Sequence, residues 1–130
     1  MQIVGAAGTG KSAIIKAMLY TGTRLGIRNS ILTVSPGGGA ALSIDGVTLD
    51  SFTWPMKGYR PLKKEIAKLR EKYAALLMII LDEVSFVKHQ DLWLLDARLR
   101  QIMGVDLPFG GLHVVLFGDF LQVWVKHSFL

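Results

Sequence analysis

One stretch near the N-terminus limits the possible folds most strongly: Gly5-Ala6-Ala7-Gly8-Thr9-Gly10-Lys11-Ser12. It fits the pattern G-x-x-x-x-G-K-[ST] of a phosphate-binding loop. Glycine lets the backbone bend tightly and approach an anion closely, so that several N–H groups converge on one phosphate. A helix that follows would add its N-terminal amides and the positive end of its dipole. We therefore predict that these residues bind a nucleotide, with Lys11 reaching its β- and γ-phosphates and Ser12 ligating Mg²⁺.

The residues on either side of this stretch support the prediction. Gln2–Val4 precedes it with the character of a strand end, and Ser12–Leu25 follows with apolar residues at roughly helical spacing. Gly26 is then expected to lie at the C-terminal end of that helix. Strand, loop and helix in this order is the context that a phosphate-binding loop requires.

Composition places the chain among globular proteins. Its 130 residues are enough for one domain or part of one, and 51% of them are hydrophobic. The longest apolar run, Tyr73–Leu81, is far shorter than the roughly 20 residues of a membrane-spanning helix. No signal peptide is predicted, because the N-terminus is occupied by the strand and loop. Without cysteine, disulfides and thiolate metal sites are excluded, and an intracellular location is expected.

The net charge of +5 is concentrated in one segment. A basic segment can bind nucleic acid, or it can be the solvated face of a helix. Taken alone, the segment favours the solvated face, and the nucleic-acid alternative stays open. Its basic residues are Lys57, Arg60, Lys63, Lys64, Lys68, Arg70 and Lys72, against Glu65 and Glu71.

Apolar runs and helical patterns alternate along the rest of the chain, which predicts an α/β fold with a parallel sheet and helices on both faces. Within the longest helix, Asp96 and Arg100 are spaced to form an ion pair. Strands are expected at Ile31–Val34, Ala75–Leu81 and Leu112–Phe117; helices at Ala40–Ile44, Thr48–Trp54, Leu62–Tyr73 and His89–Met103; and irregular segments at Ser35–Gly39, Lys57–Pro61 and Gly104–Gly111.

Polar side chains follow two of the predicted buried strands. Asp82 and Glu83 come directly after Ile79-Ile80-Leu81, where Asp82 would hold Mg²⁺ through a water and Glu83 would polarise the attacking water as a general base. Gln122, in Gly118-Asp119-Phe120-Leu121-Gln122, would contact the γ-phosphate and sense its loss, with an ordinary polar strand end as the alternative. Together with Lys11, these three residues are the predicted catalytic set.

Four stretches together resemble a known family. They are G-A-A-G-T-G-K-S, S-P-G-G-G-A-A-L-S-I-D-G-V-T-L-D-S-F, I-I-L-D-E-V-S-F-V and F-G-G-L-H-V-V-L-F-G-D-F-L-Q. In this order they resemble the first half of a Pif-type, RecD-like superfamily-one DNA helicase, a group that includes the Helitron helicases. The resemblance implies an ATPase that moves along single-stranded DNA and unwinds duplexes, with a role in DNA repair or recombination and, in a eukaryote, a nuclear or mitochondrial location.

The resemblance also implies a domain arrangement and site residues. Residues 1–122 would form a truncated RecA-like P-loop NTPase domain, residues 123–130 an unpatterned tail, and the second helicase domain would be absent. Gly5–Ser12 would bind ATP, Asp82 and Glu83 would form the Walker B pair, and Gln122 would couple the γ-phosphate to DNA. The residues that would touch the DNA strand are Ser35, Pro36, Gly37, Gly38, Thr48, Ser51 and Phe52.

Some positions depart from the family pattern. Gly37 stands where the family usually has threonine, and Asp50 stands where it usually has histidine. An acid beside a phosphate backbone should weaken DNA binding. Two alternatives therefore stay open: an inactive helicase remnant or binding module, and another P-loop NTPase or kinase. For the chain alone we expect weak Mg-ATP binding, slow hydrolysis and no unwinding.

Overall fold

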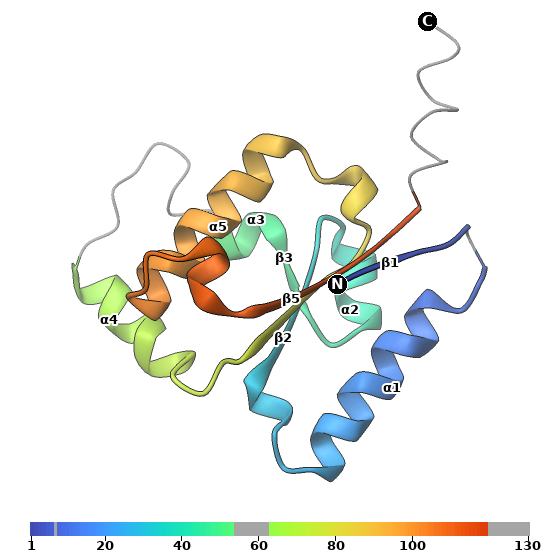
Figure 1. Cartoon of the computed structure of the whole chain (residues 1–130), viewed down its shortest axis with the longest axis horizontal. Helices are drawn as coiled ribbons and strands as arrows, with labels where there is room; N and C mark the ends of the chain where they lie inside the picture. Colours follow the sequence, from blue (N-terminus) through green and yellow to red (C-terminus); the bar gives the residue numbers. More distant parts are fainter. Residues whose placement is uncertain (7, 54–62, 120–130) are drawn as a thin grey trace, which may run out of the picture.

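The computed structural model describes residues 1–6, 8–53 and 63–119 (Figure 1). It contains a five-stranded sheet in the order β1-β5-β4-β2-β3, in which every pairing is parallel. The predicted α/β fold is therefore confirmed. The elements are β1 (Gln2–Val4), α1 (Lys11–Arg24), β2 (Ile31–Ser35), α2 (Gly38–Ser43), β3 (Val47–Thr48), α3 (Leu49–Thr53), α4 (Lys63–Lys72), β4 (Met78–Leu81), α5 (His89–Met103) and β5 (His113–Gly118), with short 3₁₀ turns at Arg28–Ser30, Val84–Phe86 and Pro108–Gly111.

Helices cover both faces of the sheet, as predicted. In Figure 1, α1 lies on one face, and α3 and α5 lie on the other. On the α1 face, Ile15 and Leu19 pack in one cluster with Ile80, Val115 and Phe117. Each face thus has its own hydrophobic core, and burial of apolar area on both sides holds the sheet between the helices.

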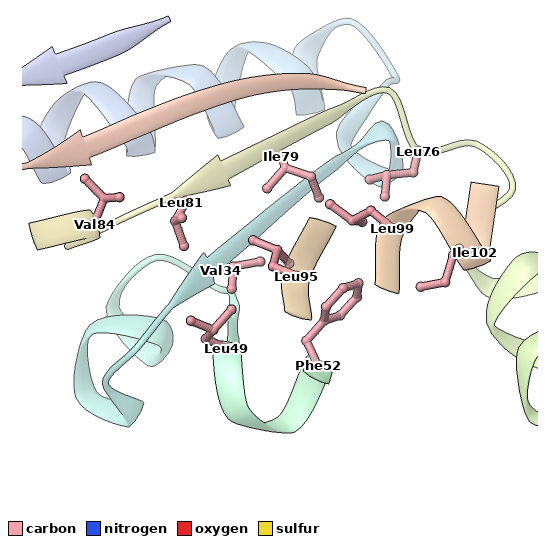
Figure 2. Close-up of a cluster of buried hydrophobic side chains, with 10 residues drawn as sticks. All are labelled: Val34, Leu49, Phe52, Leu76, Ile79, Leu81, Val84, Leu95, Leu99 and Ile102. Carbon is pink, nitrogen blue, oxygen red and sulfur yellow. The ribbon is translucent and has the colours of Figure 1, made fainter. Parts of the chain in front are cut away.

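The larger of the two cores lies under α3 and α5. Figure 2 shows side chains from these helices meeting those of β2 and β4. Leu95 and Leu99 of α5 are fully buried there, and Phe52 of α3 makes an edge-on contact with the ring of Tyr73, with 5.7 Å between the ring centroids. The buried residues are Val34, Leu49, Phe52, Leu76, Ile79, Leu81, Val84, Leu95, Leu99 and Ile102.

The two long helices agree closely with the sequence prediction. Helix α5 has the predicted bounds, and α1 begins one residue earlier than expected, at Lys11. Gly26 has the left-handed φ of 71° that suits a residue just past a helix end. No helix among residues 1–6, 8–53 and 63–119 is long and apolar enough to span a membrane.

Three local predictions need correction. Strand β4 begins at Met78 and not at Ala75, because the chain turns from Tyr73 to Leu76, where the Leu76 N–H donates to the Tyr73 carbonyl, and Leu77 is 59% exposed. The segment Ser35–Gly39 is not wholly irregular, since Ser35 ends β2 and α2 begins at Gly38. The helix predicted to begin at Thr48 begins at Leu49, because Thr48 ends the two-residue strand β3, which was not predicted. The predicted loop Lys57–Pro61 and the tail 123–130 lie outside the described residues.

Asp96 supports the turn between α5 and β5. Its carboxylate accepts a hydrogen bond from Arg100 Nε at 2.9 Å, which confirms the predicted ion pair, and another from the backbone N–H of Phe109. Phe109 has a φ of 52°, a left-handed conformation that is unfavourable for a side-chain-bearing residue. Asp96 therefore holds a strained turn in place.

We expect Asp96→Ala to lower the free energy of unfolding by about 1–3 kcal/mol, because it leaves the Phe109 N–H without its acceptor. The Arg100 pair should add little, since about a third of that side chain is exposed. Urea unfolding followed by circular dichroism measures the change. Asp106→Ala is the matched control: this carboxylate also pairs with Arg100 but is 97% exposed, so its loss should change stability by less than about 0.5 kcal/mol.

Candidate nucleotide-binding site

Three parallel strands end side by side at the carboxyl edge of the sheet. Val4 of β1 pairs in register with Gly118 of β5, and Leu81 of β4 pairs with Leu116. The N–H of Gly5 continues the ladder by donating to the carbonyl of Gly118 at 3.2 Å. Open α/β sheets bind ligands at this edge, so the residues that follow β1, β4 and β5 are placed to form one site.

The loop after β1 has the curvature that its glycines allow. Gly8 has a φ of 78° and Gly10 a φ of 87°, both in the left-handed region that other residues avoid. Thr9 closes the curve, because its hydroxyl donates to the carbonyl of Ala6 at 2.7 Å. Ala7 lies outside the described residues. The described residues of the predicted loop therefore have the expected curvature, and the loop leads directly into α1 at Lys11.

The side chain of Lys11 folds back over the loop. Its Nζ donates to the carbonyls of Gly5 and Ala6, the second at 2.8 Å. These bonds hold the ammonium group inside the curve of the loop. Ser12, one residue further along α1, faces the same space. A positive charge and a hydroxyl thus stand at the N-terminus of a 14-residue helix, where the helix dipole also favours anions.

A cavity of about 420 Å³ joins the loop to the ends of β4 and β5. It brings together predicted residues from two separate motifs, since Lys11 and Ser12 line it with Asp82 and Glu83. The lining residues are Gly8, Gly10, Lys11, Ser12, Asp82, Glu83, Ser85, Phe86, Gly118 and Asp119. This arrangement puts the ammonium group of Lys11 and the two carboxylates around one space.

The acidic pair has a defined backbone geometry. Asp82 is 7% exposed, and its Oδ1 accepts a hydrogen bond from the N–H of Glu83 at 2.8 Å. Glu83 has a φ of 53°, a left-handed conformation outside the extended path of the strand. A Cβ on Gly37 would lie 3.7 Å from Glu83 Oε2, so the Glu83 carboxylate sits beside the loop between β2 and α2. The cavity therefore borders the segment predicted to touch DNA.

Sequence reasoning missed four residues of the cavity. Ser85 and Phe86 belong to the 3₁₀ turn after the acidic pair, and Gly118 and Asp119 end β5. Asp119 is 6% exposed although it is an acid. A signal for it existed: a polar residue directly after a buried strand falls at the ligand edge of a parallel sheet, as Asp82 does.

The residues predicted to touch DNA do not share one environment. Ser35 is fully buried, and its hydroxyl has no hydrogen-bond partner among the described residues. Phe52 belongs to the core under α3, which makes its ring unavailable for stacking on a base. Ser51 and Gly38 are exposed, while Pro36, Gly37 and Thr48 are half-buried. Gln122 lies outside the described residues.

The cavity also has oxygen ligands suited to a divalent cation. Within the described part of the chain, no group of three or more His, Cys, Asp or Glu side chains could hold a metal by itself. The Ser12 hydroxyl and the Asp82 carboxylate do line the same space. Mg²⁺ typically binds one or two such oxygens and completes its shell with phosphate oxygens and water, so the residues present fit it.

Comparison with known proteins agrees with this geometry. A family model described as a PIF1-like helicase matches residues 1–125. The chain belongs to the PIF1-like helicase family. Among curated relatives, the ATP-dependent DNA helicase PIF1 of Xenopus laevis is 36% identical over 124 residues, which cover 92% of this chain and 19% of the relative. RRM3 of Saccharomyces cerevisiae is 33% identical over 125 residues, covering 92% and 17%.

Solved structures of the PIF1-like helicase family share the fold. Unliganded Pif1 from Bacteroides is 30% identical with a TM-score of 0.71, over 94% of this chain and 28% of that one. Bacteroides Pif1 bound to single-stranded DNA is 26% identical with a TM-score of 0.72, over 100% and 32%. The predicted RecA-like fold is confirmed. The chain spans less than a fifth of the length of the two curated relatives named above.

Proposed function

We propose that this chain is the first RecA-like domain, residues 1–122, of an ATP-dependent DNA helicase, and that it binds and hydrolyses ATP. The observation that carries the proposal is the shared cavity, in which Lys11 and Ser12 face Asp82 and Glu83. The loop Gly5–Ser12 would hold the phosphates through its backbone N–H groups, and Lys11 would turn from the loop carbonyls to the β- and γ-phosphates.

Residues of the same cavity would carry out hydrolysis. Ser12 and Asp82 would hold Mg²⁺, which would neutralise charge on the phosphates. Glu83 would accept a proton from the attacking water. Because its carboxylate lies beside Gly37, hydrolysis would be linked to the loop between β2 and α2. Gln122 would contact the γ-phosphate and couple its loss to DNA.

We further propose that single-stranded DNA lies along the segment Ser35–Phe52. The support comes from the family and from the related Bacteroides Pif1, which has been solved with single-stranded DNA. The buried positions Ser35 and Phe52 would shape this surface from beneath. Exposed or half-exposed groups would make the contacts themselves, namely Pro36, Gly37, Gly38, Thr48 and Ser51.

The complete activity would require more than this chain. Because the curated relatives are several times longer, we propose that a second domain completes the ATP site and the DNA path. An arginine supplied by such a domain is typically worth about 10³–10⁵ in rate. The chain alone would therefore hydrolyse ATP slowly and would not unwind DNA. In the complete protein, the activity would serve DNA repair or recombination, in the nucleus or mitochondrion of a eukaryote.

ATP binding tests the site directly. Lys11→Ala should weaken the binding of a fluorescent ATP analogue about tenfold to a hundredfold, because charge-assisted hydrogen bonds contribute about 1.5–3 kcal/mol. Lys16→Ala is the matched control, since Lys16 lies on the same helix and is exposed outside the cavity. Equal affinity of the Lys11 variant and the wild type would contradict the proposed site.

ATP turnover with and without single-stranded DNA tests the coupling. Stimulation by DNA in the wild type, lost in Lys11→Ala, would support a helicase domain already coupled to its strand. Turnover that DNA does not change would favour a P-loop NTPase with another partner. Absence of turnover in both proteins would favour the inactive remnant.

A further inference from the structure

A second cavity lies away from the nucleotide site, between α3, α4 and α5. Its volume is about 470 Å³, and none of its described lining residues belongs to the nucleotide-binding cavity. The lining residues are Val47, Ser51, Phe52, Glu65, Lys68, Leu69, Lys72, Tyr73 and Arg98. Apolar side chains of the α3 core form one part of the wall, and charged side chains of α4 and α5 form the rest.

Arg98 is the unusual member of this wall. The residue is only 2% exposed, although arginine is rarely buried without a partner. Its Nε and one terminal nitrogen, Nη1, are buried and have no hydrogen-bond partner among the described residues. Burial lowers the pKa of the guanidinium, and the nearby Glu65 raises it. Buried donors left without acceptors are costly, so an acceptor that reached these two nitrogens would stabilise the protein.

The charge around the cavity is positive. Lys68 and Lys72 line it together with Arg98, against a single carboxylate, Glu65. Among the described residues that line the cavity, Glu65 is the only acid. Lys72 also lies over the ring of Tyr73, with Nζ 5.2 Å from the ring centroid. An anion with several oxygens would satisfy the guanidinium and be attracted by both ammonium groups.

We propose that Arg98, Lys68 and Lys72 form a second anion site, which binds a phosphate group independently of the nucleotide-binding loop. A guanidinium offers paired N–H donors that match two oxygens of a phosphate, and the two lysines add positive charge. The cavity opens beside Ser51, whose hydroxyl donates to the carbonyl of Thr48 at 2.9 Å. The phosphate can therefore come from free solution or from a nucleic-acid backbone, and the two sources share the same recognition chemistry.

Thermal unfolding with inorganic phosphate tests this site. The measurement is made in a Lys11→Ala background, so that the nucleotide-binding loop contributes little. Phosphate should raise the Tm by several degrees above sodium chloride of equal ionic strength, because a ligand that binds only the folded state stabilises it. Adding Arg98→Met should abolish the shift. Its own Tm without phosphate should be equal or higher, because a thioether needs no acceptor in a buried position.

Two variants on α4 separate binding from folding. Glu65→Gln should increase the phosphate-induced shift, because it removes the only carboxylate among the described residues of the wall. Lys68→Ser should reduce the shift, while Lys64→Ser, an exposed lysine of the same helix outside the cavity, should leave it unchanged. A purely structural Arg98 would not produce these opposite effects. If phosphate does not raise the Tm, or raises it equally in the Arg98 and Lys68 variants, the proposal is wrong.

An oligonucleotide titration identifies the source of the phosphate. If the backbone of single-stranded DNA occupies the cavity, Arg98→Met should weaken oligo-dT binding. The slope of log K against log salt concentration should also become shallower by about 0.7, the value for one lost phosphate contact. If DNA binding is unchanged while the phosphate shift is lost, the site takes a free phosphate. Either result supports the second anion site, and neither depends on ATP binding at Lys11.

Discussion

Glu83→Gln is expected to lower ATP turnover by about 10²–10⁴-fold, which is the usual contribution of a positioned general base. The Glu83 carboxylate lines the same cavity as Lys11 and Ser12, whereas the amide of glutamine cannot accept the proton of the attacking water. The substitution keeps the size of the side chain and the left-handed backbone at this position. ATP binding should therefore stay within about threefold of the wild type, as expected for a group that acts on the transition state.

Turnover of radiolabelled ATP under single-turnover conditions is the appropriate measurement, because the chain alone is expected to be slow. Glu71→Gln supplies the control, since it makes the same chemical change on an exposed part of α4 outside the cavity. If the Glu83 and Glu71 variants hydrolyse ATP at the same rate, Glu83 is not the general base.

Phe117→Ala is expected to lower the free energy of unfolding by about 3–5 kcal/mol, a large part of the roughly 5–15 kcal/mol that a small domain has. Phe117 is fully buried on β5, between the neighbouring strands and α1. Truncation removes its buried area from the core and leaves a cavity that a close-packed sheet fills poorly. Gly118 and Asp119 follow directly, so the carboxyl end of β5 at the nucleotide cavity should loosen as well.

Urea denaturation gives the change from the midpoint and slope of the transition. Trp93→Ala is the matched aromatic control: Trp93 lies on α5 with 66% of its surface exposed, and its loss should change stability by about 0.5 kcal/mol or less. A cost below about 1 kcal/mol for Phe117→Ala would mean that the core on the α1 face collapses around the missing ring.

The curvature of the loop before α1 could be predicted because few residue types adopt positive φ angles without strain. Positive φ angles at Gly8 and Gly10, and the approach of Lys11 to the loop carbonyls, follow from a local pattern that needs no distant contact. Helix α5 could be predicted for a different reason: its apolar residues repeat at helical spacing from Leu92 to Ile102 over several turns. In both cases the information lies within one continuous segment.

Other features depend on contacts that the local sequence does not contain. The run Ala75–Leu81 is apolar throughout, so nothing in it shows that Leu76 is buried in a turn while Leu77 is exposed. Strand β3 has two residues and exists because it pairs with β2. The burial of Arg98 could have been predicted in part. Arg98 lies three residues after Leu95 and four before Ile102, which places it on the inward face of α5.

One of the two edge strands of the described sheet, β1, leads directly into the nucleotide loop. In the sheet as described, β1 lies at an edge, has three residues and pairs only with β5. Such a strand should open locally long before the domain unfolds, which exposes its amides to hydrogen exchange. A nucleotide held by the loop at Gly5 would have to be released before β1 could separate from Gly118. Nucleotide binding should therefore slow amide exchange along β1 first. Exchange at this edge strand would then measure occupancy of the nucleotide cavity, although β1 itself does not line that cavity.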